Sequence, residues 1–115
     1  MRERIRDKER LEHILEASNK LLENKDKYTL EEIKANSVLF YGFVKLVEII
    51  GEACYMLTKE FRESHPETNW KMIENMRHVL VHGYYAITPE LLWATIHEDI
   101  QPLVEQINIY IKEEL

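Results

Sequence analysis

The stretch that decides the fold is Val38-Leu-Phe-Tyr-Gly-Phe-Val-Lys-Leu-Val-Glu-Ile-Ile-Gly-Glu-Ala-Cys-Tyr-Met-Leu57, near the middle of the chain. Its length and composition predict a helix within a bundle, and its most apolar part is interrupted by Lys45 and Glu48 and is too short to span a bilayer. The apolar residues cover more than one face, so we expect a second copy of the chain to cover the surplus in a homodimer. Gly42 and Gly51 each permit a kink or a tight helix crossing, and the sequence does not choose between them.

Helical signals also precede this stretch. Apolar residues repeat at helical spacing as far as Asn24, with charged residues on the opposite face, which predicts an amphipathic first helix. The segment Thr29-Leu-Glu-Glu32 has the pattern of a capping box, in which the threonine hydroxyl and the glutamate carboxylate bind backbone N–H groups. A second helix is therefore expected to begin near Leu30.

Two proline-containing segments divide the second half of the chain. Ser64-His65-Pro66 predicts a connection, followed by a third helix that ends at Gly83. Thr88-Pro89 predicts the start of the last helix, which Pro102 should kink because its ring removes a backbone hydrogen bond. With no alternating strand pattern of useful length, residues 1–115 are expected to form one all-α domain, an antiparallel bundle of four to five helices.

Composition limits the classes of function. The 115 residues are 45% apolar and 31% charged with a formal charge of −6, so bulk electrostatic attraction for nucleic acid is excluded and any RNA contact must be local. The single cysteine, Cys54, lies in an apolar run and is expected to be a buried thiol. The first ten residues are charged in both signs and contain no apolar core, so we expect a cytoplasmic protein without a signal peptide.

The end of the predicted third helix gathers side chains that can do chemistry: Arg77, His78, His82, Tyr84 and Tyr85. A structural interpretation is available, in which Arg77 pairs with Glu74, the histidines are solvated and the tyrosines fill the following loop. By spacing alone the structural interpretation is favoured, because short motifs often occur by chance.

A catalytic interpretation needs Arg77 and His82 to meet. They are five positions apart and diverge by about 140° on an ideal helix. A shared site therefore requires a loosened helix end, the reach of the long arginine, or a second subunit. Their chemistry suits RNA cleavage without a metal, because a 2′-hydroxyl attack on phosphate needs a proton-transfer group and a fixed cation.

This segment, Arg77-His-Val-Leu-Val-His82-Gly-Tyr84, matches the pattern R-x-x-x-x-H-x-Y and resembles the HEPN superfamily, in particular the HepT-like (DUF86) ribonuclease toxins. The resemblance extends in order over nearly the whole chain, through Arg10–Ile14, Ile49–Ala53, Trp70, Leu92–Ile96 and Asp99–Leu103. His78 and Gln101 depart from the pattern, and neither is one of the three motif residues.

The resemblance implies a homodimer with both motifs in a shared cleft, acting on RNA such as tRNA or mRNA as a metal-independent endoribonuclease toxin. From the chemistry of metal-free RNA cleavage we assign Arg77 as phosphate clamp, His82 as general acid or base, and Tyr84 as the orienting hydroxyl and modification site. The resemblance does not depend on these roles. It further implies a minimal nucleotidyltransferase (MNT) antitoxin that uses Mg-ATP to add AMP to Tyr84, while the toxin itself needs no cofactor. Tyr84 is preferred to Tyr85 only because the motif places its tyrosine there.

Two other functions stay open. A metal enzyme could use His78 and His82, four positions apart, together with His97-Glu98-Asp99, although no third ligand is fixed by spacing. A non-catalytic helical module could instead bind a nucleotide or a nucleotidyltransferase through Arg77 and His82, because a fold and a motif can persist without the activity.

Overall fold

The computed structural model describes the backbone of residues 2–82 and 87–114 and the side chains of residues 6–78 and 87–113. Every regular element in these ranges is helical, which confirms the all-α prediction. The elements are α1 (Arg2–Asn24), α2 (Leu30–Ala35), α3 (Ser37–Met56), α4 (Lys59–Ser64), α5 (Trp70–His82), α6 (Pro89–Ala94), a π-helical turn (Thr95–Asp99) and α7 (Ile100–Glu114).

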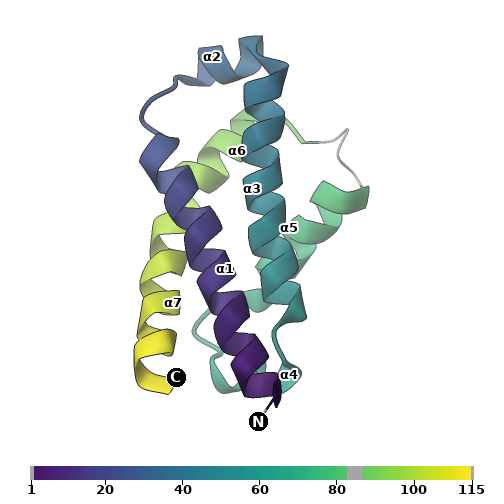
Figure 1. The fold of residues 1–115 in the computed structure, drawn as a ribbon. Coiled ribbons are helices and arrows are strands. Elements are labelled where there is room, and N and C mark those ends of the chain that lie inside the picture. The colour runs from purple at the N-terminus through teal and green to yellow at the C-terminus, as the bar shows by residue number, and fades with distance from the viewer. Residues whose placement is uncertain (1, 83–86, 115) are drawn as a thin grey trace.

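Four long helices, α1, α3, α5 and α7, form the bundle. In Figure 1 successive long helices run in alternating directions, and the two chain ends lie at the same end of the molecule. Helix α3 packs against both α1 and α5, and α1 also packs against α7. The predicted antiparallel bundle is therefore confirmed, and the stretch quoted first is its central helix.

The core draws on each of the long helices. Its fully buried side chains include Leu11 and Ile14 from α1, Val47 and Ile50 from α3, and Ile107 from α7. Burial of each such side chain contributes about 1.5–3 kcal/mol relative to exposure. The amphipathic pattern of α1 and the apolar faces of α3 and α7 thus act on one shared core.

The predicted helix starts have the expected caps. The backbone N–H of Glu32 donates to Thr29 Oγ1 over 3.1 Å, and the Thr29 N–H donates to Glu32 Oε1 over 3.1 Å, which completes the capping box. Thr88 Oγ1 accepts from the N–H of Leu91 over 3.1 Å. Pro89 occupies the first turn of α6, where its missing N–H removes no helical bond.

Breaks on both sides of α3 went unpredicted, since one second helix was expected to begin near Leu30 and to include the central apolar stretch. Before α3, the side chain of Asn36 caps the new helix by accepting from the Leu39 N–H over 3.1 Å. Thr58 caps α4 by accepting from the Phe61 N–H over 3.2 Å. Buried Asp7 of α1 accepts from the Thr58 N–H over 2.9 Å and from its hydroxyl over 2.7 Å. These bonds join residues 51 positions apart, which sequence spacing does not reveal.

The interruption expected at Pro102 takes the form of the π-helical turn Thr95–Asp99, which separates α6 from α7. In a regular α-helix the proline ring clashes with the carbonyl four residues earlier, here that of Glu98. The π-turn contains Glu98, so the helix departs from regular α geometry one turn before Pro102, and Pro102 itself lies within α7.

Candidate functional site

The site is built on the crossing of α3 and α5 at Gly51. A Cβ atom added to Gly51 would lie 2.9 Å from the Cβ of Arg77 and 3.4 Å from its Cα, closer than carbon atoms normally pack. No such neighbour lies within 4 Å of Gly42. Of the two glycines that the sequence left open, Gly51 is the one that permits a tight helix crossing.

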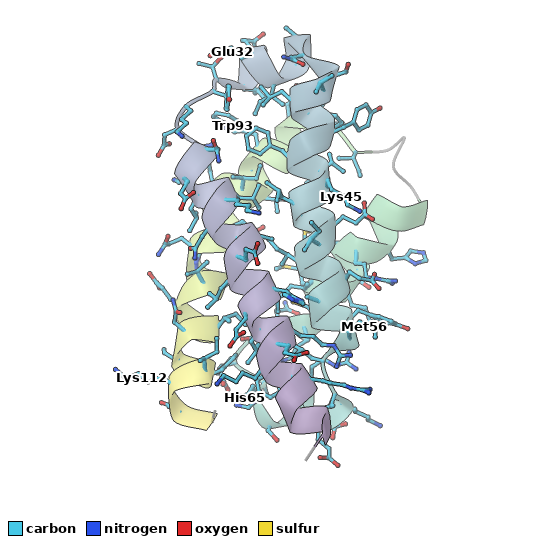
Figure 2. All side chains as sticks on the ribbon, in the orientation of Figure 1. Glu32, Lys45, Met56, His65, Trp93 and Lys112 are labelled. Atoms are coloured by element: carbon cyan, nitrogen blue, oxygen red, sulfur yellow. The ribbon has the colours of Figure 1, made fainter. Side chains whose placement is uncertain are left out.

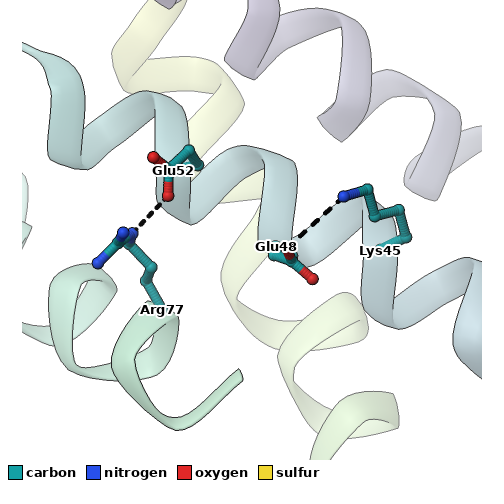
Figure 3. A network of polar contacts seen from close by, with 4 residues as sticks. All are labelled: Lys45, Glu48, Glu52 and Arg77. Atoms are coloured by element: carbon teal, nitrogen blue, oxygen red, sulfur yellow. Dashed lines mark hydrogen bonds and ion pairs between the residues drawn. The ribbon is translucent and has the colours of Figure 1, made fainter. Parts of the chain in front are cut away.

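Arg77 reaches from α5 across to α3. Its Nε donates to Glu52 Oε2 over 2.6 Å (Figure 3), and its Cζ lies 4.2 Å from the centre of the Tyr55 ring. Among the residues that the structure describes, neither terminal guanidinium nitrogen has a hydrogen-bond partner. The guanidinium is thus held through one nitrogen and one face, while its terminal fork remains available to a ligand.

The partner of Arg77 corrects the structural interpretation of its sequence neighbourhood. Glu74, three positions earlier on α5, is the carboxylate that spacing suggested, whereas the ion pair is with Glu52 on α3. Neither Glu52 nor Tyr55 was singled out as a site residue. A usable signal was helical spacing, because Tyr55 follows Gly51 by four residues and Glu52 by three, and side chains three or four positions apart are neighbours on a helix.

A hollow lies beside this contact. It has a volume of about 320 Å³ between α1 and α3, and it is lined by Arg10, His13, Lys45, Glu48, Ile49, Glu52, Ala53 and Met56. Lys45 and Glu48 form an ion pair of 3.6 Å across its rim (Figure 3). Glu52 belongs to both places, since it lines the hollow and holds Arg77.

An exposed apolar stripe follows the same side of α3. Val38 is 81% exposed, Tyr41 58%, Ile49 37% and Met56 46%. Met56, near the end of α3, is labelled in Figure 2. Together with the exposed charged residues Lys45 and Glu52, these positions recur every three or four residues, which places them in one line along the helix. Glu52 falls between Ile49 and Met56 in this line, so the stripe runs past the carboxylate that holds Arg77.

The other predicted site residues fare differently. His78 is exposed on α5, and His82 is the last residue of that helix, with its side chain outside the described part. Tyr84 and Tyr85 lie outside the described residues altogether. The meeting of Arg77, His82 and Tyr84 therefore stays a prediction.

The remaining candidates can be placed in part. No three His, Cys, Asp or Glu side chains within the described ranges come together as a metal-binding group, and these ranges exclude the His82 imidazole. His97, one of the ligands considered for a metal, packs against Trp93 with ring centres 4.1 Å apart and ring planes inclined by 35°. Cys54 is 3% exposed and burial raises the pKa of its thiol to about 12, so it is the predicted buried thiol. None of the helices in residues 2–82 and 87–114 is both long and apolar enough to cross a membrane.

Comparison with known proteins shows which protein family this sequence matches. The family model described as "Ribonuclease HepT-like" matches residues 14–109. A protein named "Putative RNase TTE0752" from Caldanaerobacter subterraneus subsp. tengcongensis is 38% identical over 104 residues, which are 90% of this chain and 93% of the relative. The "Probable ribonuclease HepT" of Thermococcus cleftensis is 32% identical over 96 residues, 84% of this chain and 87% of the relative. No solved structure matches.

Proposed function

The chain belongs to the HepT-like ribonuclease family, and from that premise we propose that it is the endoribonuclease toxin of a HEPN/MNT toxin–antitoxin pair. It cuts RNA such as tRNA or mRNA without a metal ion, using Arg77 and His82, with Tyr84 as the orienting hydroxyl. Its place of action is the cytoplasm. The whole chain acts as one domain.

The observation that carries this proposal is the state of Arg77. Its Nε is bound to Glu52 over 2.6 Å, and its terminal nitrogens have no hydrogen-bond partner among the described residues. A planar guanidinium can hold two phosphate oxygens at once with such a fork. In a chain with a formal charge of −6, a cation arranged in this way is suited to local phosphate recognition.

The reaction follows from the two residue types. The 2′-oxygen of one nucleotide forms a bond to the adjacent phosphorus while the bond from phosphorus to the 5′-oxygen breaks. His82 makes one of the two proton transfers, from the 2′-hydroxyl as base or to the departing 5′-oxygen as acid, and water makes the other. Arg77 stabilises the charge that develops on the phosphate oxygens. The products are a 2′,3′-cyclic phosphate, which can open to a 3′-phosphate, and a 5′-hydroxyl.

The exposed stripe on α3 supports a homodimer. Four large apolar side chains, Val38, Tyr41, Ile49 and Met56, would leave water if a second copy covered this line. Because Glu52 lies in the same line, a partner seated there would bring its own groups beside Arg77. A two-fold axis at this stripe would then bring the Arg77–Tyr84 motifs of the two subunits to one shared cleft.

Control by a minimal nucleotidyltransferase antitoxin is part of the same proposal. The antitoxin would transfer AMP from Mg-ATP to Tyr84, forming a bond between the phenolic oxygen and the α-phosphorus while pyrophosphate leaves. The added phosphate is negatively charged and would compete with RNA for Arg77. The modified protein should therefore bind RNA weakly.

The test is cleavage of total tRNA in excess EDTA, with protein whose intact mass shows no AMP on Tyr84. We expect wild type to leave cyclic or 3′-phosphate ends. His82→Ala should cleave at least about 100-fold more slowly, as expected for loss of a general acid or base. Arg77→Ala should lose about 100- to 1,000-fold, as for loss of a transition-state donor. Lys20→Ala is the control, because it removes an exposed charged side chain of α1 that does not line the hollow.

Three results would count against the proposal. The first is an unmodified wild type that cuts no RNA, which would favour the non-catalytic binding module. The second is a His82→Ala variant that cleaves at the wild-type rate. Cleavage that stops in EDTA and returns with a divalent cation would favour the metal enzyme instead.

A further inference from the structure

Three residues of α3 converge on one residue of α5. Gly51 allows the backbone of Arg77 to approach, Glu52 binds its Nε over 2.6 Å, and the Tyr55 ring lies 4.2 Å from its Cζ. These contacts act on different parts of the arginine: its Cα and Cβ, one edge of the guanidinium, and one face of it. Together they fix where the guanidinium lies and which way its terminal nitrogens point.

An arginine that is already held in place is suited to binding phosphate, because little side-chain entropy is lost when the substrate binds. A free arginine side chain has many rotamers, and ordering it at the moment of substrate binding opposes both binding and reaction. A carboxylate bound to Nε removes most of this freedom and leaves the two terminal nitrogens for phosphate. In a bidentate arginine–carboxylate pair, by contrast, the carboxylate would occupy the terminal N–H groups that a phosphate needs.

Exposure indicates that the contact is not mainly a stabilising one. The side chain of Glu52 is 51% exposed and that of Arg77 is 21% exposed. Ion pairs with this much solvent contribute little to folding. The main effect of the ion pair is therefore to orient the guanidinium of Arg77.

We propose that Glu52, with Tyr55 beneath the guanidinium, is the positioning residue of this site: it binds Nε of Arg77 so that the terminal nitrogens face a phosphate of the RNA. This inference rests on the proposed ribonuclease function and adds to it a residue from outside the R-x-x-x-x-H-x-Y motif. Glu52 itself touches neither the RNA nor the reacting atoms.

The first experiment observes the hold on Arg77 without any RNA. In ¹H–¹⁵N spectra of the full chain, the Nε–H signal of Arg77 is identified by its loss in Arg77→Lys. We expect this signal to exchange slowly with water in wild type, to shift and exchange faster in Glu52→Ala, and to be intermediate in Glu52→Gln, whose neutral amide oxygen accepts a weaker hydrogen bond.

Glu48→Gln is the matched control. Glu48 lies one turn before Glu52, lines the same hollow and pairs with Lys45 over 3.6 Å, so the variant removes the same charge without touching Arg77. Its Arg77 signal should equal that of wild type. An Arg77 signal that is unchanged in Glu52→Ala, or that moves equally in Glu48→Gln, would overturn the inference.

The second experiment measures kinetics on a defined RNA oligonucleotide. Glu52→Ala should lower kcat by about 10- to 100-fold, the range that misplacing a catalytic group produces, while KM stays within about threefold. Glu52→Gln should recover part of the rate, and thermal unfolding should show all variants folded. An active wild type matched in kcat by Glu52→Ala would refute the role.

Failure of the two ideas can be told apart. If the unmodified wild type cuts no RNA, the proposed nuclease fails, and the Nε–H signal still decides whether Glu52 holds Arg77. If the wild type cuts RNA and the signal is independent of Glu52, the nuclease stands and the positioning role falls.

Discussion

Replacing Gly51 by alanine tests whether the close crossing of α3 and α5 sets the position of Arg77. The new Cβ would lie 2.9 Å from the Cβ of Arg77 and 3.4 Å from its Cα. Because carbon atoms pack at about 3.5–4.0 Å, α5 must move by at least about half an ångström. The contacted atoms are on or next to the backbone, so rotation of a side chain cannot relieve the contact.

The expected magnitude is the difference between two effects. Overpacking costs about 1–3 kcal/mol. Replacing glycine by alanine inside a helix returns about 1 kcal/mol. Gly51→Ala should therefore lower the free energy of unfolding by about 0–2 kcal/mol, and by displacing Arg77 it should slow RNA cleavage by about tenfold.

Gly42→Ala is the control on the same helix. Gly42 is exposed and nothing lies within 4 Å of an added Cβ, so within one subunit only the gain in helix propensity applies. We expect a stabilisation of about 1 kcal/mol and an unchanged cleavage rate. The assay is urea unfolding followed by circular dichroism at one protein concentration, together with tRNA cleavage. A Gly51→Ala protein that is as stable and as active as Gly42→Ala would refute the reasoning.

Three further predictions concern the bundle. Asp7→Ala removes a buried carboxylate that accepts two hydrogen bonds from Thr58, so the free energy of unfolding should fall by about 1.5–3 kcal/mol in urea titrations, whereas exposed Asp26→Ala should leave it unchanged. Burial raises the pKa of the Cys54 thiol to about 12, so iodoacetamide at pH 8 should alkylate it only after unfolding; rapid alkylation of the native protein would contradict its buried position. Burial also raises the pKa of Tyr110 to about 12, against an ordinary value of 10.0. The folded protein therefore holds the phenolic proton more tightly than the unfolded chain. The contribution of Tyr110 to the free energy of unfolding is fully present below pH 10 and is lost as the pH rises towards 12. Titration followed by ultraviolet absorbance should show one tyrosine that ionises at a higher pH than the others, and this ionisation should be absent in Tyr110→Phe.

Much of the fold could be predicted because its signals are local. The Thr29 capping box and the Thr88-Pro89 start depend on residues within one turn, and both appear where the pattern placed them. The strong apolar content of residues 38–57 likewise predicted a helix, and the structure places it between α1 and α5. These two helix starts follow from neighbours along the chain, whereas the equally local caps of α3 and α4, at Asn36 and Thr58, were not recognised.

The contacts that build the site are not local, and this is why they escaped prediction. Arg77 and Glu52 are 25 positions apart, and Asp7 and Thr58 are 51 apart. Spacing offered Glu74 as a partner for Arg77, since it lies on the same helix. The close approach of α3 and α5 at Gly51 is what brings the carboxylate of Glu52 to the guanidinium of Arg77.

The choice of arginine at position 77 follows from the same crossing. Within the described residues, Lys20, Lys34 and Lys59 also pair with carboxylates, each through its single ammonium group. A lysine reaching Glu52 would bring its one charged nitrogen to the carboxylate and away from any phosphate. Arginine separates the two tasks, because Nε can bind the protein while the terminal fork binds the ligand. In a chain whose charge repels RNA overall, this division keeps one cation both fixed in place and available.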